Sequence, residues 1–147
     1  MLYLYILLTV IAGVAVTVQV GVNNALRQSI NSPVVAAFFS FAVGTIGLLI
    51  YAVATRTSWP SMQTIAKVPT WAWFGGVLGA FYVVTAIIAA PKLGAASLIG
   101  ILVTTQLCTS LVLDHFGLIG FAQHSINVWR ATGALLLIAG VMLIVKN

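Results

Sequence analysis

Polar side chains recur every fourth residue in two otherwise apolar stretches of this chain. Positions four apart lie on one face of a helix, so each series would form a polar stripe along an apolar helix. An amide in such a helix either hydrogen-bonds to a neighbouring helix or lines a water-accessible cavity, and for any single residue both alternatives are open. The two series are Gln19, Asn23 and Arg27, and Gln106, Ser110 and Asp114.

The three amides taken together favour a cavity. Gln19 and Gln106 sit well inside apolar segments, and Asn23 lies about one helical turn beyond Gln19. Three amide side chains are more than helix packing requires. We therefore expect Gln19, Asn23 and Gln106 to contact a substrate in a central cavity.

Asp114 is the only acidic residue of the sequence. It could carry a coupling proton or bind a cation, but we favour an ion pair at the membrane interface. Two partners are open, because Arg130 lies on the same side of the membrane and Arg27 of an inverted second copy would also lie there. His115 and His124 lie in the following connector and can titrate near neutral pH. They lack metal-ligand spacing, so we expect ordinary loop or interfacial residues.

Enzyme chemistry finds no support in the sequence. There is no pair of acidic residues, no nucleophile with a base at a useful spacing, no glycine-rich phosphate loop and no Cys/His cluster. The six Lys and Arg residues form no basic cluster, so a nucleic-acid partner is not expected. We therefore expect a protein that is not an enzyme and that binds neither a metal nor a cofactor.

The composition is that of a membrane protein. Hydrophobic residues make up 62% of the 147 and charged residues 5%, against roughly 25% charged residues in a soluble domain. Five segments reach the roughly 20 mostly apolar residues that a helix needs to cross a bilayer. Ser32 and Pro33 are typical of a helix start, and Pro91 is expected to end the third span. This predicts an all-α membrane protein with one domain over residues 1–147, whose spans cover about residues 3–26, 33–55, 71–90, 94–113 and 128–145.

The charges between the spans are divided evenly across the membrane. An excess of Lys and Arg on one side normally fixes the orientation of a membrane protein. Here one side carries Arg56, Lys67 and Arg130, and the other carries Arg27, Lys92 and Lys146. The even split predicts insertion in both orientations, and hence pairing of the chain with its own inverted copy.

Six strings of residues, taken in order, cover essentially the whole chain. They are V-Q-V-G-V-N-N-A-L (Val18 to Leu26), S-P-V-V-A-A-F-F-S-F-A-V-G-T (Ser32 to Thr45), W-F-G-G-V-L-G-A-F-Y-V (Trp73 to Val83), P-K-L-G-A-A (Pro91 to Ala96), the stretch from Gln106 through L-D-H-F-G-L-I-G (Leu113 to Gly120), and R-A-T-G-A-L-L-L-I-A-G-V (Arg130 to Val141). Together they resemble the YdcZ-type family of the drug/metabolite transporter superfamily. The resemblance implies a ten-helix inverted-repeat assembly, formed as an antiparallel homodimer of five-span chains in the bacterial inner membrane. In inverted-repeat transporters the substrate lies near the midplane at the repeat interface. That would place Gln19, Asn23 and Gln106 of both copies around one cavity.

The resemblance also implies transport. We expect a secondary exporter of a small metabolite or drug-like compound, whose identity the sequence leaves open. The related small multidrug resistance proteins couple to protons through a glutamate in their first helix. Span one of this chain has no carboxylate, and Gln19, its nearest polar counterpart, cannot titrate. A neutral or anionic substrate therefore fits better than a cation. A dual-topology channel for a small ion or a neutral solute is the alternative.

Overall fold

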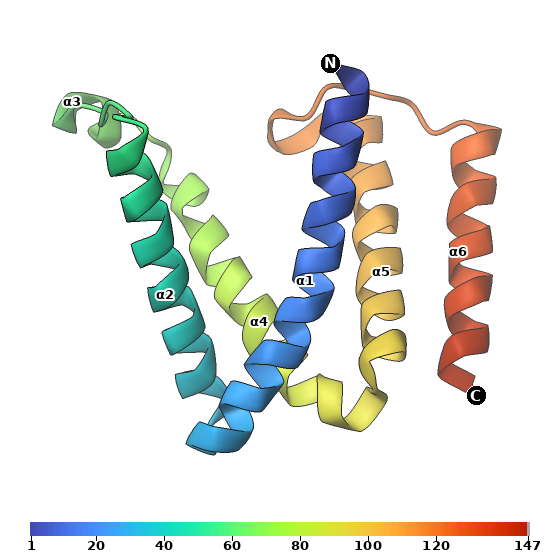
Figure 1. Cartoon of the computed structure of the whole chain (residues 1–147). Coiled ribbons are helices and arrows are strands. Elements are labelled where there is room, and N and C mark those ends of the chain that lie inside the picture. The colour runs from blue at the N-terminus through green and yellow to red at the C-terminus, as the bar shows by residue number, and fades with distance from the viewer. Residues whose placement is uncertain (147) are drawn as a thin grey trace. The chain divides into compact units, whose positions relative to one another are not determined.

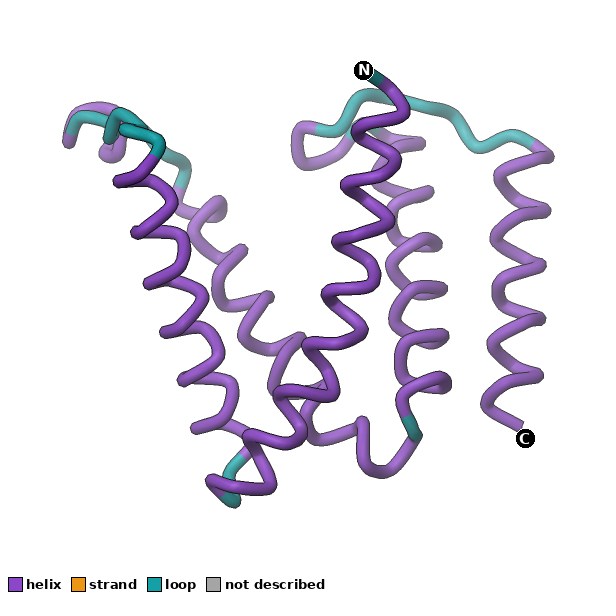
Figure 2. Tube along the Cα trace, in the orientation of Figure 1, coloured by secondary structure: helices purple, strands orange, loops and turns teal. Residues whose placement is uncertain are grey.

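Helices make up most of the chain. The computed structural model describes residues 1–146, and among these five helical segments are long and apolar enough to cross a membrane, as expected. The segments are α1 (Leu2–Ile30), α2 (Pro33–Ala54), η1 with α4 (Thr70–Trp73 and Phe74–Leu93), α5 (Ala95–Phe116) and α6 (Val128–Lys146) (Figure 1). Two short helices, α3 (Met62–Ala66) and η2 (Leu118–Gly120), lie in the connecting segments (Figure 2).

The chain divides into two compact units, and each is described by itself. The first unit comprises Met1–Pro91 and contains α1, α2, α3, η1 and most of α4. The second begins at Lys92 and contains α5, η2 and α6. The candidate sites described below each lie within one unit.

Asn31 and Ser32 make a tight turn between α1 and α2. Asn31 adopts a left-handed conformation with φ 60°, and its backbone N–H donates to the carbonyl of Arg27 at 2.7 Å. The Ser32 hydroxyl accepts a backbone N–H of the next helical turn at 3.3 Å, and Pro33 occupies the first position of α2. The start of α2 is thus as predicted. By contrast, α1 extends beyond its predicted end at about residue 26. It continues to Ile30 because the left-handed residue, Asn31, comes only after it.

The expectation that Pro91 ends the third span is wrong. Proline lacks only the N–H that would bond to the carbonyl of Ile87, and α4 continues through it to Leu93. The helix ends instead at Gly94, whose φ of 77° and ψ of 158° form a conformation that is open essentially to glycine alone. The α4–α5 turn therefore depends on Gly94 rather than on Pro91.

The core of the first unit lies where α2 meets α4. Ala36 and Ala37 of α2 are buried together with Val83 and Ile87 of α4, and Leu26 of α1 packs against this cluster. Small side chains let helices approach closely in lipid, where the hydrophobic effect offers little drive for association. The two alanines thus form the α2 side of this buried cluster.

In the second unit, α5 and α6 pack against each other. A Cβ added to Gly100 of α5 would lie 2.7 Å from Cγ2 of Val141 in α6, which is closer than side-chain atoms approach one another. Leu98 and Ala134 are also buried in this unit. Gly100 is therefore required for the observed approach of the two helices.

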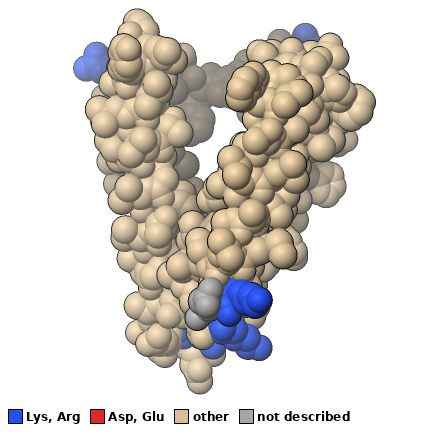
Figure 3. Space-filling view, turned by 90° about the vertical axis from the view of Figure 1, so that its right-hand side faces the viewer, with Lys and Arg blue, Asp and Glu red and all other residues tan. Residues whose placement is uncertain are grey.

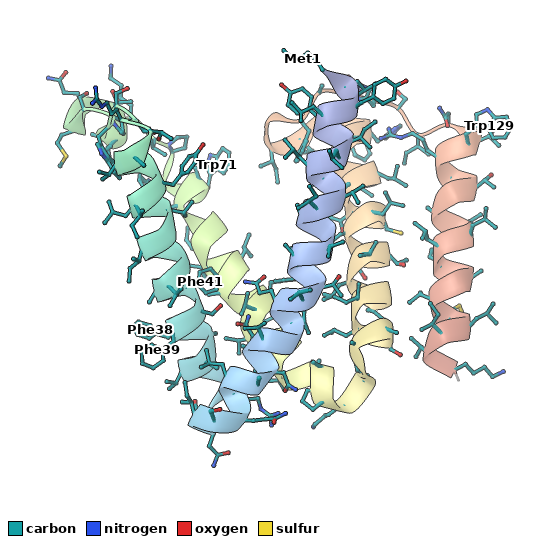
Figure 4. All side chains as sticks on the ribbon, in the orientation of Figure 1. Met1, Phe38, Phe39, Phe41, Trp71 and Trp129 are labelled. Carbon is teal, nitrogen blue, oxygen red and sulfur yellow. The ribbon has the colours of Figure 1, made fainter. Side chains whose placement is uncertain are left out.

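The outer surface suits a bilayer. Lys and Arg atoms lie near the ends of the helices, and uncharged residues cover the length between them on the face shown in Figure 3. Trp71 and Trp129 lie at the starts of η1 and α6 and are 59% and 84% exposed (Figure 4). Tryptophans at such positions are typical of the membrane–water interface.

Candidate functional site

An open groove lies on the first unit between α1 and α2. Gln19 is its one lining residue from α1, and Ser40, Phe41, Gly44, Thr45 and Leu48 of α2 form the rest. Its volume is about 440 Å³. Pockets of roughly 300–1,000 Å³ accommodate small-molecule ligands. We call this feature the Gln19 groove.

The Gln19 groove lies at mid-length of α2, a helix long enough to cross a bilayer. Gly44 is the twelfth of the 22 residues of α2, so it lies about 17 Å from the start of a helix that is about 33 Å long. A helix of this length matches the roughly 30 Å hydrocarbon layer. The residues that line the groove with Gly44 are therefore far from both membrane surfaces.

Two polar groups in the groove lack protein partners. The Thr45 hydroxyl donates to the carbonyl of Phe41 at 2.8 Å, which satisfies it within α2. Neither the Gln19 amide nor the Ser40 hydroxyl makes a side-chain hydrogen bond to any residue among 1–146. An unpaired polar group in hydrocarbon is costly. The Gln19 groove thus offers donors and acceptors to water, to a ligand or to a second chain.

Phe41 gives the groove an apolar wall. Its ring lies 3.7 Å from the position of a Cβ added to Gly79 of α4. Figure 4 shows Phe41 on the side of α2 that faces α4, whereas Phe38 and Phe39 lie on the outer side. The groove therefore combines an aromatic ring with uncharged polar groups, and no charged side chain lines it.

The structure separates the other two predicted amides from the groove lining. Asn23 is only 4% exposed and does not line the groove. Gln106 lies on α5 in the second unit, where its side chain is exposed. A common cavity for the three amides remains a prediction.

Asn24 is a polar residue that the sequence analysis missed. Its Oδ1 is buried and has no hydrogen-bond partner among the described residues. Asn24 follows Asn23 directly, so it lies about 100° around the helix from Asn23, the middle residue of the polar stripe. The only signal in the sequence that could have identified Asn24 is its position directly after Asn23 in an otherwise apolar helix.

Asp114 and Arg130 form an ion pair in the second unit. Arg130 Nη2 donates to Asp114 Oδ2, and the two side chains are 30% and 23% exposed. Arg130 Nη1 also donates to the carbonyl of His124 at 2.7 Å, and its backbone N–H donates to Asn127 Oδ1 at 2.9 Å. Arg130 is thus one of the two partners expected for Asp114, and a coupling role for this carboxylate remains a prediction.

Arg27, the other expected partner, lies in the last turn of α1. Its side chain is half-buried and makes no ion pair within residues 1–146. A cation in the last turn is favourable because the helix dipole is negative at that end. Pairing of Arg27 with Asp114 of an inverted copy remains a prediction.

The connector between α5 and α6 is tied to the end of α5 by hydrogen bonds to Asp114 and His115. His115 Nδ1 accepts the backbone N–H of Ile126 at 3.1 Å, and the His115 carbonyl accepts Gln123 Nε2 at 3.1 Å. The Asp114 carbonyl accepts the backbone N–H groups of Gly117 at 3.3 Å and His124 at 2.8 Å. The two histidines therefore belong to an ordered network, which their sequence spacing did not indicate.

The chain was compared with known families and proteins. A family model described as "Putative inner membrane exporter, YdcZ" matches residues 4–143. The inner membrane protein YdcZ of Escherichia coli (strain K12) is 26% identical over 137 residues, which cover 92% of this chain and 91% of that protein. No solved structure matches the chain.

Proposed function

This chain belongs to the YdcZ family of inner membrane proteins, and we propose that it exports a small metabolite or drug-like compound as an antiparallel homodimer. The Gln19 groove is the observation that carries this proposal. It combines a ligand-sized volume, unpaired polar groups and a position at the depth of the bilayer centre. Secondary transporters built from inverted repeats bind their substrates at this depth.

An inverted second copy would complete the transport unit. Five spans per chain leave the two ends of the domain on opposite sides, so a second copy in the reverse orientation supplies the inverted repeat. The even division of Lys and Arg supports insertion both ways. Val43, Leu48 and Ile50 of α2 are each more than 55% exposed, which leaves apolar helix surface available to lipid or to a partner chain.

The groove chemistry favours an uncharged substrate. Gln19 and Ser40 offer both donors and acceptors, and the Phe41 ring offers an apolar contact. No carboxylate lines the groove to balance a cation. Anionic compounds fit less well than neutral ones because no Lys or Arg lines the groove either.

A channel formed by the same inverted pair is the second candidate, since an even charge split suits a two-fold pore equally well. Flux against substrate concentration separates the two functions. A transporter saturates with slow turnover, whereas a channel shows a large unitary flux.

The experiment is uptake into proteoliposomes of a labelled panel that contains uncharged, anionic and cationic compounds. We expect saturable transport of uncharged members and a loss of about tenfold in Gln19→Leu, the scale of one lost buried hydrogen bond. The matched control is Gln28→Leu, which alters the same residue type at the exposed end of α1. Transport that is unchanged in Gln19→Leu would overturn the assignment of the groove.

A further inference from the structure

We propose that His115 is a proton-binding site, and that a proton on its Nδ1 releases Ile126, in the connector between α5 and α6, from the end of α5. The connector comprises the residues between Phe116 and Val128. The release is a local opening at one membrane surface, and it requires neither a substrate nor a second copy.

The hydrogen bonds of His115 fix its protonation state. Its Nδ1 accepts the backbone N–H of Ile126 at 3.1 Å, so this nitrogen must carry a lone pair and the ring must be neutral, with its proton on Nε2. A proton on Nδ1 would set two donors against each other. The connector with Ile126 bonded to His115 is therefore compatible only with a neutral His115 ring.

His124 provides an internal contrast within the same connector. Its Nδ1 lies 3.0 Å from the carbonyl of Ala122, which can only accept, so this nitrogen donates. The contact survives when the ring takes up a second proton. Protonation of His115 on Nδ1 is thus incompatible with its contact to Ile126, whereas protonation of His124 leaves its contact to Ala122 intact.

Within residues 1–146, no neighbouring group of His115 would hold the protonated ring in its present position. Besides His115, the titratable or charged groups of the elements around it are Asp114 and Cys108 of α5, His124 of the connector, and Arg130 and Lys146 of α6. Asp114 and Arg130 are paired with each other, and the His115 ring is edge-on to Phe116 with centroids 4.7 Å apart. His115 Nδ1 thus has a backbone N–H as its partner and no carboxylate that would hold the charged ring in place.

The release would act on the second half of the connector. Ile126 lies between His124, whose carbonyl is held by Arg130, and Asn127, whose side chain accepts the Arg130 backbone N–H at the start of α6. Loss of the bond to His115 frees the stretch around Ile126, while the hydrogen bonds of Gln123 and His124 to the end of α5 remain. The proton does not affect the contacts of Arg130 with His124 and Asn127, so the first turn of α6 is expected to remain helical.

A spin label on a Ser125→Cys variant in a Cys108→Ser background tests this inference. Ser125 is exposed and adjacent to Ile126, so the nitroxide reports the mobility of the connector. Spectra of the protein in lipid nanodiscs are recorded at about pH 8 and about pH 5, the range in which histidine changes charge. The mobile fraction is expected to rise by up to about tenfold at the lower pH, the scale of one hydrogen bond. Identical spectra at both pH values would overturn the proposal.

Two further variants locate the proton. His115→Asn keeps an acceptor oxygen near the position of Nδ1 but cannot titrate, so we expect an immobile label at both pH values. His124→Asn is the matched control and is expected to retain the full pH response. A pH response that persists in His115→Asn would place the proton elsewhere and contradict the assignment. Identical spectra of the labelled protein that keeps His115 would by themselves overturn the proposal. The test therefore does not depend on the folding of His115→Asn or His124→Asn.

Discussion

Asp114, near the end of α5, accepts a hydrogen bond from the guanidinium of Arg130 in the first turn of α6. The pair joins the two helix ends that the connector spans. Both groups are partly exposed, and Arg130 also holds the carbonyl of His124. This arrangement favours a structural role for Asp114, the only acidic residue of the sequence.

We predict that Asp114→Asn lowers the free energy of unfolding by about 1 kcal/mol, because a partly exposed ion pair contributes little and Arg130 keeps its bond to His124. Thermal unfolding in a mild detergent measures the change. A double-mutant cycle with Arg130→Gln should give a coupling energy of about 0.5–1 kcal/mol.

The same Asp114→Asn variant separates the two roles considered for this residue. If the ion pair is structural, the variant transports at close to the native rate once it is folded. Complete loss of transport in a folded variant would instead assign the coupling proton to Asp114.

We predict that Gly100→Ala destabilises the packing of α5 on α6 by about 1–3 kcal/mol, because the new methyl group would collide with Val141. Gly133→Ala in α6 is the matched control, since nothing lies within 4 Å of a Cβ added there. Unfolding of both variants is followed in the same detergent. Adding Val141→Ala to Gly100→Ala should restore most of the loss, and failure to do so would contradict the contact.

A charge placed in the Gln19 groove should change its selectivity. We predict that Gln19→Glu binds cationic compounds about tenfold more tightly than the native chain, because a carboxylate at the depth of the bilayer centre is costly unless a cation pairs with it. Binding to the purified protein is measured by equilibrium dialysis of labelled cationic and neutral compounds. Gln28→Glu at the end of α1 is the control and should leave both affinities unchanged. Equal effects of the two variants would argue against the groove.

Much of the fold could be predicted from the sequence because long apolar runs and local capping signals are sufficient to define helices. The five spans and the Ser32–Pro33 start of α2 are examples. The end of α4 was misplaced because a proline in the last turn removes one hydrogen bond without stopping the helix, and the conformation of Gly94 is not visible in the sequence.

The site was harder to predict than the spans. The sequence singled out Gln19 through its spacing, but not its neighbours Ser40 and Phe41, which depend on how α2 faces α1. The network around His115 was missed because most of its bonds involve backbone groups of the connector. Such bonds depend on the three-dimensional path of the chain and have no spacing pattern.

The most direct test of the antiparallel homodimer is the topology of the chain in intact cells. Ser58→Cys and Ser29→Cys, made separately in a Cys108→Ser background, place one thiol near each end of α2 without changing any charge. A membrane-impermeant thiol reagent then labels whichever end faces outward. The even charge split predicts that each variant is labelled in about half of the molecules. Full labelling of one variant and none of the other would show a single orientation and contradict the antiparallel homodimer.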